Sequence, residues 1–221
     1  ASRLSAGDVV FEIGPGTGML TEGLLRAGVR VIAIETDARA IAMLRERFAK
    51  EIRADQLVLR HADMRDTAPA DFASRDAPYS VVANIPYYLS GMLLRTTLSS
   101  ERQPRRIVFL VQKEVAERIA QCRQREKRIP GASQDLASCF GSGSEPKEPQ
   151  GVQHRYGGKE SLLSLSVKAY GNPRYVATVS RGNFAPQPKV DSAILSIEDI
   201  SRKRFENLDE LWFFTVLRAG F

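Results

Sequence analysis

The sequence predicts an α/β fold in which a mostly parallel sheet ends in an antiparallel pair of strands. Short apolar runs bounded by turn residues recur early in the chain, at residues 9–13, 31–35 and 57–59. Segments with apolar residues at helical spacing separate them, and this alternation is typical of a parallel sheet covered by helices on both faces. Two strand-like runs lie close together late in the chain, at 175–179 and 193–197, and they predict the antiparallel pair.

The other elements follow the same alternation. Two more buried strands are predicted at residues 80–83 and 107–111. Helices are predicted at residues 21–27, 38–50, 89–98, 114–120 and 161–170. Because ligands bind at the carboxyl ends of the strands in such sheets, the residues that follow each strand are the first candidates for a site.

The length and composition predict one main domain. The chain has 221 residues, of which 43% are hydrophobic, and we assign the domain to residues 1–200. Within it, residues 121–158 are rich in Gly, Ser, Pro and charged side chains, so we expect a flexible insertion there. Residues 201–221 are expected to begin a C-terminal helical region that is incomplete.

Several classes of protein are disfavoured. The sequence has no apolar run long enough to span a membrane and no apolar leader, which predicts a cytoplasmic protein, or an organellar one if the source is eukaryotic. Cys122 and Cys139 have no histidine at metal-ligand spacing, so no metal site is predicted. The formal charge of +6 and the pI near 9.5 favour an anionic partner such as nucleic acid.

The turn after the first strand reads Glu-Ile-Gly-Pro-Gly-Thr-Gly. Gly14, Gly16 and Gly18 allow the backbone to pass close to a ligand. A dinucleotide fingerprint would place its third glycine at position 19, which is Met19, so a nicotinamide cofactor is disfavoured. Glu12, just before the turn, suits a cationic ligand such as a sulfonium amino acid.

Carboxylates follow the next two strands. Glu35 ends the second strand, where it can accept both hydrogen bonds of a ribose diol, and Asp63 follows the third, where it can accept from an adenine amine. Each feature also has a structural explanation: a tight turn for the glycines, a solvated strand end for Glu35 and a helix cap for Asp63. Their occurrence at successive strand ends favours a nucleoside cofactor.

The fourth strand runs into Asn84-Ile85-Pro86-Tyr87. If the Asn84 side-chain oxygen and the Ile85 carbonyl accept the two N–H bonds of an adenine amine, the nitrogen lone pair can face a methyl donor. Pro86 fixes the turn, and Tyr87 offers a face on which the base can stack. The turn therefore predicts catalysis by positioning and electrostatics, without a base to remove the proton first.

Four blocks in order resemble the rRNA adenine N6,N6-dimethyltransferases of the KsgA type: residues 14–18, 84–90, 111–119 and 184–193. The resemblance implies a Rossmann-like, S-adenosylmethionine-dependent methyltransferase fold with a seven-stranded sheet. It implies that Gly14, Glu35, Asp63 and Asn84 contact S-adenosylmethionine, with Asn84 shared between the cofactor and the target amine.

The same resemblance assigns aromatic residues to the target base. It implies that Tyr87 and Phe184 stack on or flank a flipped adenine, which offsets part of the cost of extruding the base. Phe184 has the alternative role of anchoring its loop in the core. For Tyr88 we expect packing in the core.

The resemblance further implies dimethylation of two adjacent adenines near the 3′ end of small-subunit rRNA, by a monomer that acts in ribosome maturation. Two alternatives stay open: a large-subunit rRNA methyltransferase of the macrolide-resistance type, and a non-catalytic RNA-binding assembly or transcription factor. Three departures from the family pattern are expected to matter. The chain lacks the usual segment before the first strand, it stops before a basic C-terminal helical domain, and it contains the insertion at 121–158.

Overall fold

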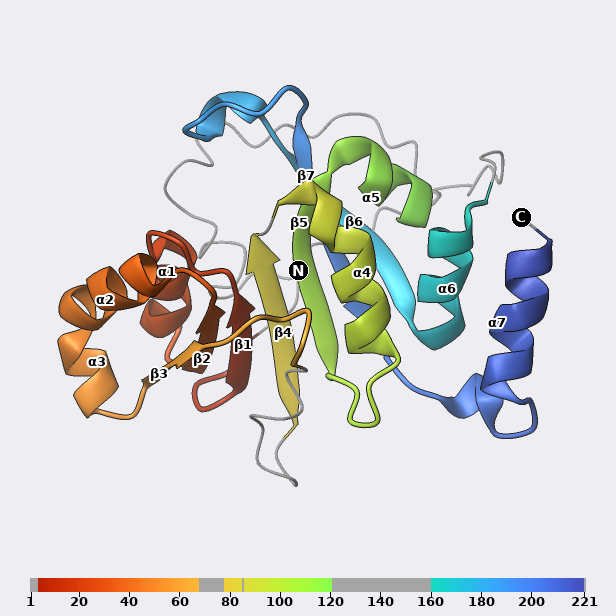
Figure 1. The fold of residues 1–221 in the computed structure, drawn as a ribbon, viewed down its shortest axis with the longest axis horizontal. Coiled ribbons are helices and arrows are strands. Elements are labelled where there is room, and N and C mark those ends of the chain that lie inside the picture. Colours follow the sequence, from red (N-terminus) through yellow and green to blue (C-terminus); the bar gives the residue numbers. More distant parts are fainter. Residues whose placement is uncertain (1–3, 68–77, 85, 121–159, 221) are drawn as a thin grey trace, which may run out of the picture.

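The computed structural model describes residues 4–67, 78–84, 86–120 and 160–220. They form an α/β fold around one seven-stranded sheet (Figure 1) with the strand order β3-β2-β1-β4-β5-β7-β6. The strands are β1 (Val9–Ile13), β2 (Arg30–Glu35), β3 (Leu57–His61), β4 (Tyr79–Asn84), β5 (Arg106–Gln112), β6 (Asn172–Val179) and β7 (Ser192–Glu198).

The helices connect the strands as an α/β fold requires. They are α1 (Met19–Arg26), α2 (Ala38–Arg47), α3 (Ala49–Arg53), α4 (Tyr87–Leu98), α5 (Lys113–Ala120), α6 (Leu162–Tyr170) and α7 (Glu210–Ala219), with the short 3-10 helices η3 (Arg181–Asn183) and η4 (Lys203–Phe205). None of the helices in the described part of the chain is long and apolar enough to cross a membrane.

The predicted fold class is confirmed. Strands β1 to β5 pair in parallel, β7 pairs antiparallel to β5, and β6 pairs antiparallel to β7. From β1 the chain first builds the sheet outward through β2 and β3, then returns to place β4 on the other side of β1. This reversal lies at the carboxyl ends of β1 and β4, where open α/β sheets bind ligands.

Apolar residues cover both faces of the sheet, as predicted. One buried cluster joins the strands to α4, α5 and α6 and includes Phe11, Phe109 and Leu94. The other joins them to α1 and α2 and includes Leu24 and Leu44. The strands are therefore anchored on both sides, and their carboxyl ends are held as a rigid edge.

The structure corrects one predicted helix. Residues 38–50 were expected to be continuous, but α2 ends at Arg47 and α3 begins at Ala49. Phe48 between them leaves helical geometry, with φ −110° and ψ 31°, and its ring is buried. The Phe48 ring lies in the same buried cluster as Leu44 and Leu24.

The C-terminal segment packs on α6 through aromatic side chains. Phe214 of α7 stacks on Tyr170 with ring centroids 5.6 Å apart, and Phe205 of η4 lies 5.4 Å from the same ring. The Tyr170 hydroxyl donates to the carboxylate of Glu210 at 2.5 Å. The predicted domain boundary at residue 200 stays a prediction, and the predicted insertion at 121–158 lies outside the described residues.

Candidate functional site

The register of the sheet brings the predicted site residues to one edge. Ile13 pairs with Ile34 of β2 and with Ala83 of β4, so Gly14, Glu35 and Asn84 are the next residues on three neighbouring strands. Glu35 pairs with His61 at the end of β3, and Asp63 lies two residues further along. The four residues thus follow one another across the carboxyl edge in the order Asp63, Glu35, Gly14, Asn84.

The glycine turn adopts a backbone that requires glycine. Gly14, Gly16 and Gly18 have φ values of 67°, 54° and 82°, in the left-handed region that other residues rarely adopt. A side chain on Gly16 would meet nothing within 4 Å, so the backbone here faces open space. A side chain on Gly18 would lie 2.6 Å from the Phe48 ring and 2.7 Å from Leu44, which means that this glycine allows α1 to pack.

Glu12 has an internal partner that the sequence did not indicate. Its carboxylate is fully buried beneath α1, and Oε2 accepts a hydrogen bond from the Thr21 hydroxyl at 2.7 Å. Its other oxygen, Oε1, is buried without a hydrogen-bond partner among the described residues. Burial raises the pKa of the Glu12 carboxyl from 4.5 to about 7, and Glu35 adds a smaller repulsion in the same direction.

Glu35 ties two turns together. Its Oε1 accepts from the Thr36 and Asp37 backbone amides at 2.7 Å and 3.0 Å, and its Oε2 accepts from the Gly16 amide at 3.3 Å. The carboxylate thereby bridges the glycine turn and the start of α2. It also stays at the edge of the sheet, half-exposed, where the sequence placed it.

Asp63 is bound by a neighbour that the sequence reasoning missed. Arg65 donates to it from its backbone amide at 2.8 Å and from Nε and Nη2 at 2.9 Å and 2.6 Å. The hydrogen bonds from the Arg65 side chain hold the pKa of Asp63 below its usual value. Asp63 therefore stays ionised and stabilises a turn at residues 64–66, where the structural explanation had expected a helix.

Asn84 ends β4 at this edge, and its side chain is exposed. Ile85 lies outside the described residues. Pro86 is the residue before α4, with φ −53° and ψ 136°, and the helix begins at Tyr87. The predicted strand-to-helix turn at Asn84 is therefore present.

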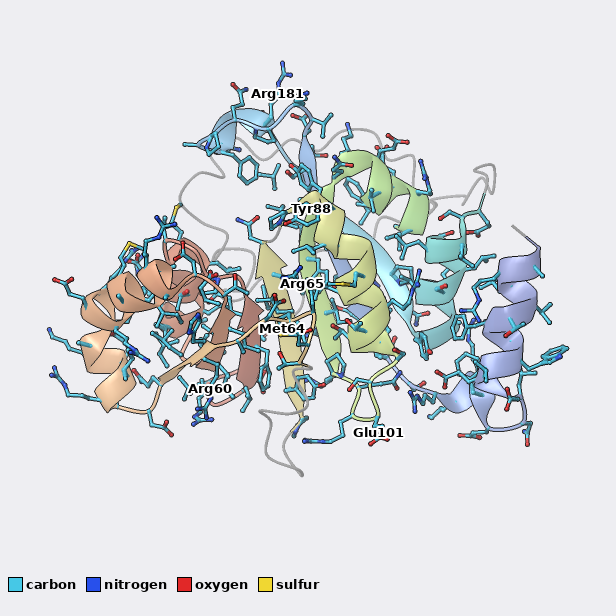
Figure 2. All side chains as sticks on the ribbon, in the orientation of Figure 1. Arg60, Met64, Arg65, Tyr88, Glu101 and Arg181 are labelled. Atoms are coloured by element: carbon cyan, nitrogen blue, oxygen red, sulfur yellow. The ribbon has the colours of Figure 1, made fainter. Side chains whose placement is uncertain are left out.

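Of the two tyrosines after Pro86, Tyr88 lies differently from the prediction, and the role of Tyr87 stays a prediction. The Tyr87 hydroxyl is 2.7 Å from Ser192 Oγ at the start of β7, and its side chain is half-buried. Tyr88 was expected in the core, but it is 82% exposed where α4 begins (Figure 2), so that prediction was wrong. The helix direction at Tyr87 turns that residue toward β7 and turns the next one, a rotation of about 100° further round, toward solvent.

Phe184 follows η3 in the connection between β6 and β7. Its half-buried ring packs against the core cluster on the α1 face, which includes Leu110 and Ile194. The role as a loop anchor is therefore confirmed, and the role beside a base stays a prediction.

Three residues contribute to the site without having been predicted: Thr21, Arg65 and Ser192. Each forms a hydrogen bond with a predicted residue: Thr21 with Glu12, Arg65 with Asp63, and Ser192 with Tyr87. Of the three, only Ser192 lies in one of the blocks that carry the family resemblance, residues 184–193. Because it is 105 residues from Tyr87 in the sequence, no local pattern predicts their contact. No cluster of three or more potential metal ligands occurs among the described residues.

An apolar cavity of about 360 Å³ lies elsewhere, between α4, α6 and α7. It is lined by Leu98 and Ser99 from the C-terminal end of α4, which is the end away from the carboxyl edge of the sheet. It is therefore separate from the residues at the strand ends.

Comparison with known proteins identifies the family of the chain. A family model described as "Ribosomal RNA adenine dimethylase" matches residues 1–129 and 150–221. The chain is 36% identical over 221 residues to a ribosomal RNA small subunit methyltransferase A from Dehalococcoides mccartyi, strain CBDB1, covering 100% of this chain and 63% of that relative. The chain thus spans less than two thirds of the relative's length.

Two solved structures share the fold. A dimethyladenosine transferase from Plasmodium falciparum is 27% identical with a TM-score of 0.66, over 97% of this chain and 63% of that one. The 23S rRNA methyltransferase ErmE is 21% identical with a TM-score of 0.68, over 97% of this chain and 70% of that one. The second likeness concerns the fold alone.

Proposed function

The chain belongs to the ribosomal RNA adenine dimethylase family, and from this premise we propose that it transfers methyl groups from S-adenosylmethionine to N6 of adenine in small-subunit rRNA. The proposed product is a pair of adjacent dimethylated adenines near the 3′ end. One observation carries the proposal: the strand register sets the Asn84 turn directly beside the Gly14–Gly18 turn. A turn suited to a planar amine thus adjoins a turn open to a cofactor.

The residues at the edge fit the cofactor. Gly16 faces open space, and the Glu35 carboxylate lies beside it at 3.3 Å from its amide, so a ribose could be held where the two turns meet. Gly14 and Asn84 would flank the methionine part. When bound, S-adenosylmethionine supplies a methyl group already activated by its sulfonium, so the proposal includes no metal ion.

The chain's own contribution is to position the adenine. The Asn84 side-chain oxygen, exposed at the end of β4, would accept an N–H from the exocyclic amine. Tyr87 and Phe184 would flank the base, and both are held in place: Tyr87 by Ser192, and Phe184 by the core cluster. Such preorganised groups act without the cost of ordering them during the reaction.

Relatives favour the small subunit over the alternatives. The relative at 36% identity carries small-subunit methyltransferase in its name, whereas ErmE, a 23S rRNA methyltransferase, is 21% identical. The relative is bacterial, which supports a cytoplasmic setting and a role in ribosome maturation. We propose that the protein acts as a monomer.

The test is methyl transfer from labelled S-adenosylmethionine to under-methylated small ribosomal subunits, with the modified nucleotide mapped. The Asn84→Ala variant should lose about 2.7–4 kcal/mol of transition-state stabilisation, or about 10²–10³ in turnover, by analogy with the loss of one positioned polar group. Asn207→Ala is the matched control, since Asn207 is exposed in the loop before α7.

Three outcomes are informative. Dimethyladenine formed by the wild type and by Asn207→Ala, but not by Asn84→Ala, supports the proposal. Near-normal turnover in Asn84→Ala removes that residue from the mechanism. Cofactor binding without any transfer by the wild type favours the non-catalytic RNA-binding alternative.

A further inference from the structure

A polar cavity of about 580 Å³ opens at the carboxyl end of the sheet. One wall is the junction of β5 and α5, with Lys113, Glu114 and Glu117, and the other is the segment between β6 and β7, with Arg181 and Lys189. Figure 2 shows Arg181 on this segment, above the carboxyl edge. The backbone amide of Lys113 donates to the Asp191 carbonyl at 3.0 Å and joins the two walls.

The cavity adjoins the proposed adenine site. Asp191 lines it, and the next residue, Ser192, is the hydrogen-bond partner of Tyr87 at 2.7 Å. Ser192 also pairs with Gln112 at the end of β5, so the cavity begins one residue from the contact that holds the start of α4. A strand whose base lay at Asn84 would pass close to it.

Three cations and three carboxylates line the cavity. Asp191 Oδ1 accepts from the backbone amide of Arg181 at 3.0 Å, and Glu114 is paired with Arg118 at 2.7 Å. Glu114 is thus paired with a cation from outside the lining of the cavity, and Arg181 and Lys189 are exposed residues.

Arg181 and Lys189 are brought together by the loop itself. Arg181 Nη1 donates to the Lys189 carbonyl at 3.2 Å, so the guanidinium is fixed close to the lysine backbone. A guanidinium has five N–H donors, and this bond uses one. The other donors of Arg181 and the ammonium of Lys189, which lines the same wall of the cavity, are groups of the kind that bind phosphate oxygens.

We propose that this cavity binds a backbone phosphate of the RNA strand that carries the target adenine, with Arg181 and Lys189 as its contacts. The inference rests on the proposed function, because it takes RNA as the substrate. Phosphate contacts of this kind fix the register of a strand without reading its sequence. The cavity would hold the strand while one of its bases is turned into the site beside Asn84.

The test is the salt dependence of binding to an unmethylated RNA hairpin that contains the two adjacent adenines. The affinity for RNA falls as salt rises. Loss of one phosphate contact makes a plot of log K against log salt shallower by about 0.7 for a single strand. The double variant Arg181→Gln, Lys189→Gln removes the one proposed phosphate contact, so the salt dependence should become shallower by about 0.7, with cofactor affinity unchanged. A matched control that removes two exposed cations away from this edge is Arg53→Gln, Arg204→Gln.

The outcomes separate this inference from the proposed function. Wild-type methylation together with an unchanged slope in the double variant overturns the phosphate site and leaves the proposed function standing. A lowered slope in a chain that transfers no methyl group supports the phosphate site and overturns the reaction. A wild-type chain that does not bind the hairpin overturns both. If the double variant fails to fold, Lys189→Gln alone keeps the Arg181 guanidinium and should show about half the change.

Discussion

At the scale of single residues, Glu12 places an ionisable group inside the sheet. It has no exposed surface, and a single hydroxyl, from Thr21, binds its carboxylate. Among the titratable groups in the described part of the chain, Glu35 is the one that acts on it, and that effect is repulsive. The protonated form is therefore favoured by folding, because burial penalises the charged form.

We expect this group to make stability depend on pH. The pKa of Glu12 is about 7 in the folded chain and near 4.5 in the unfolded chain, so between these values the folded state holds a proton that the unfolded state has lost. Its contribution to the free energy of unfolding accordingly falls as pH rises through this window, by about 2 kcal/mol between pH 5 and pH 8. Urea unfolding of the wild type and of Glu12→Gln at both pH values measures the difference.

The Glu12→Gln variant should lack this fall in the free energy of unfolding with pH. Glu46→Gln, at an exposed position in α2, should show the same pH dependence as the wild type. A Glu12→Gln curve parallel to that of the wild type over this pH range would mean that the Glu12 carboxyl is not buried as the structure has it.

At the scale of elements, the glycine turn combines two different demands. Gly16 faces open space, and Gly18 faces the Phe48 ring at 2.6 Å, although both have positive φ. We expect Gly16 to leave room for a ligand and Gly18 to allow the packing of α1. Replacing each glycine by alanine in turn distinguishes these two roles.

Gly16→Ala should cost about 1–2 kcal/mol of stability from backbone strain, and it should weaken cofactor binding because the methyl group enters the open space. Gly18→Ala carries the same strain plus overpacking of about 1–3 kcal/mol against Phe48 and Leu44. Chemical unfolding and calorimetric titration with S-adenosylmethionine measure both effects. Equal stability losses in the two variants would contradict the close packing at Gly18.

Sequence patterns located the elements well because each strand is a compact apolar run. All seven strands were predicted, and their ends were correct to within a few residues. The parallel strands β1 to β5 read as continuous apolar segments because both of their faces are buried. The carboxyl-edge residues followed from this, because strand ends fix where Gly14, Glu35 and Asn84 lie.

The direction in which a side chain points near the start of a helix could not be predicted from the sequence. A helix boundary is uncertain by one or two residues, and each residue turns the face by about 100°, so the choice between Tyr87 and Tyr88 as the inward residue could not be made. The partner of Asp63 was missed for a related reason: Arg65 reaches back two positions through a turn whose geometry no periodicity describes.

At the scale of the whole molecule, stability is not evenly distributed. Strands β1, β4 and β5 are at the centre of the sheet, with almost continuous buried runs. By contrast, α7 has no buried residue and exposes Leu211, Trp212 and Val216. It is held to α6 by the Phe214–Tyr170 stack and by the hydrogen bond to Glu210.

We therefore expect α7 to open without unfolding of the sheet. Hydrogen exchange should give its amides a lower opening free energy than those of Leu110 in β5, because local units with few buried contacts open sub-globally. Phe214→Ala removes an aromatic pair worth about 0.5–1.5 kcal/mol beyond its buried area, so it should speed exchange in α7 and leave Leu110 unchanged. Trp212→Ala, at a residue that is 57% exposed, should alter neither. If Phe214→Ala accelerated Leu110 as much as α7, the helix would belong to the same cooperative unit as the sheet.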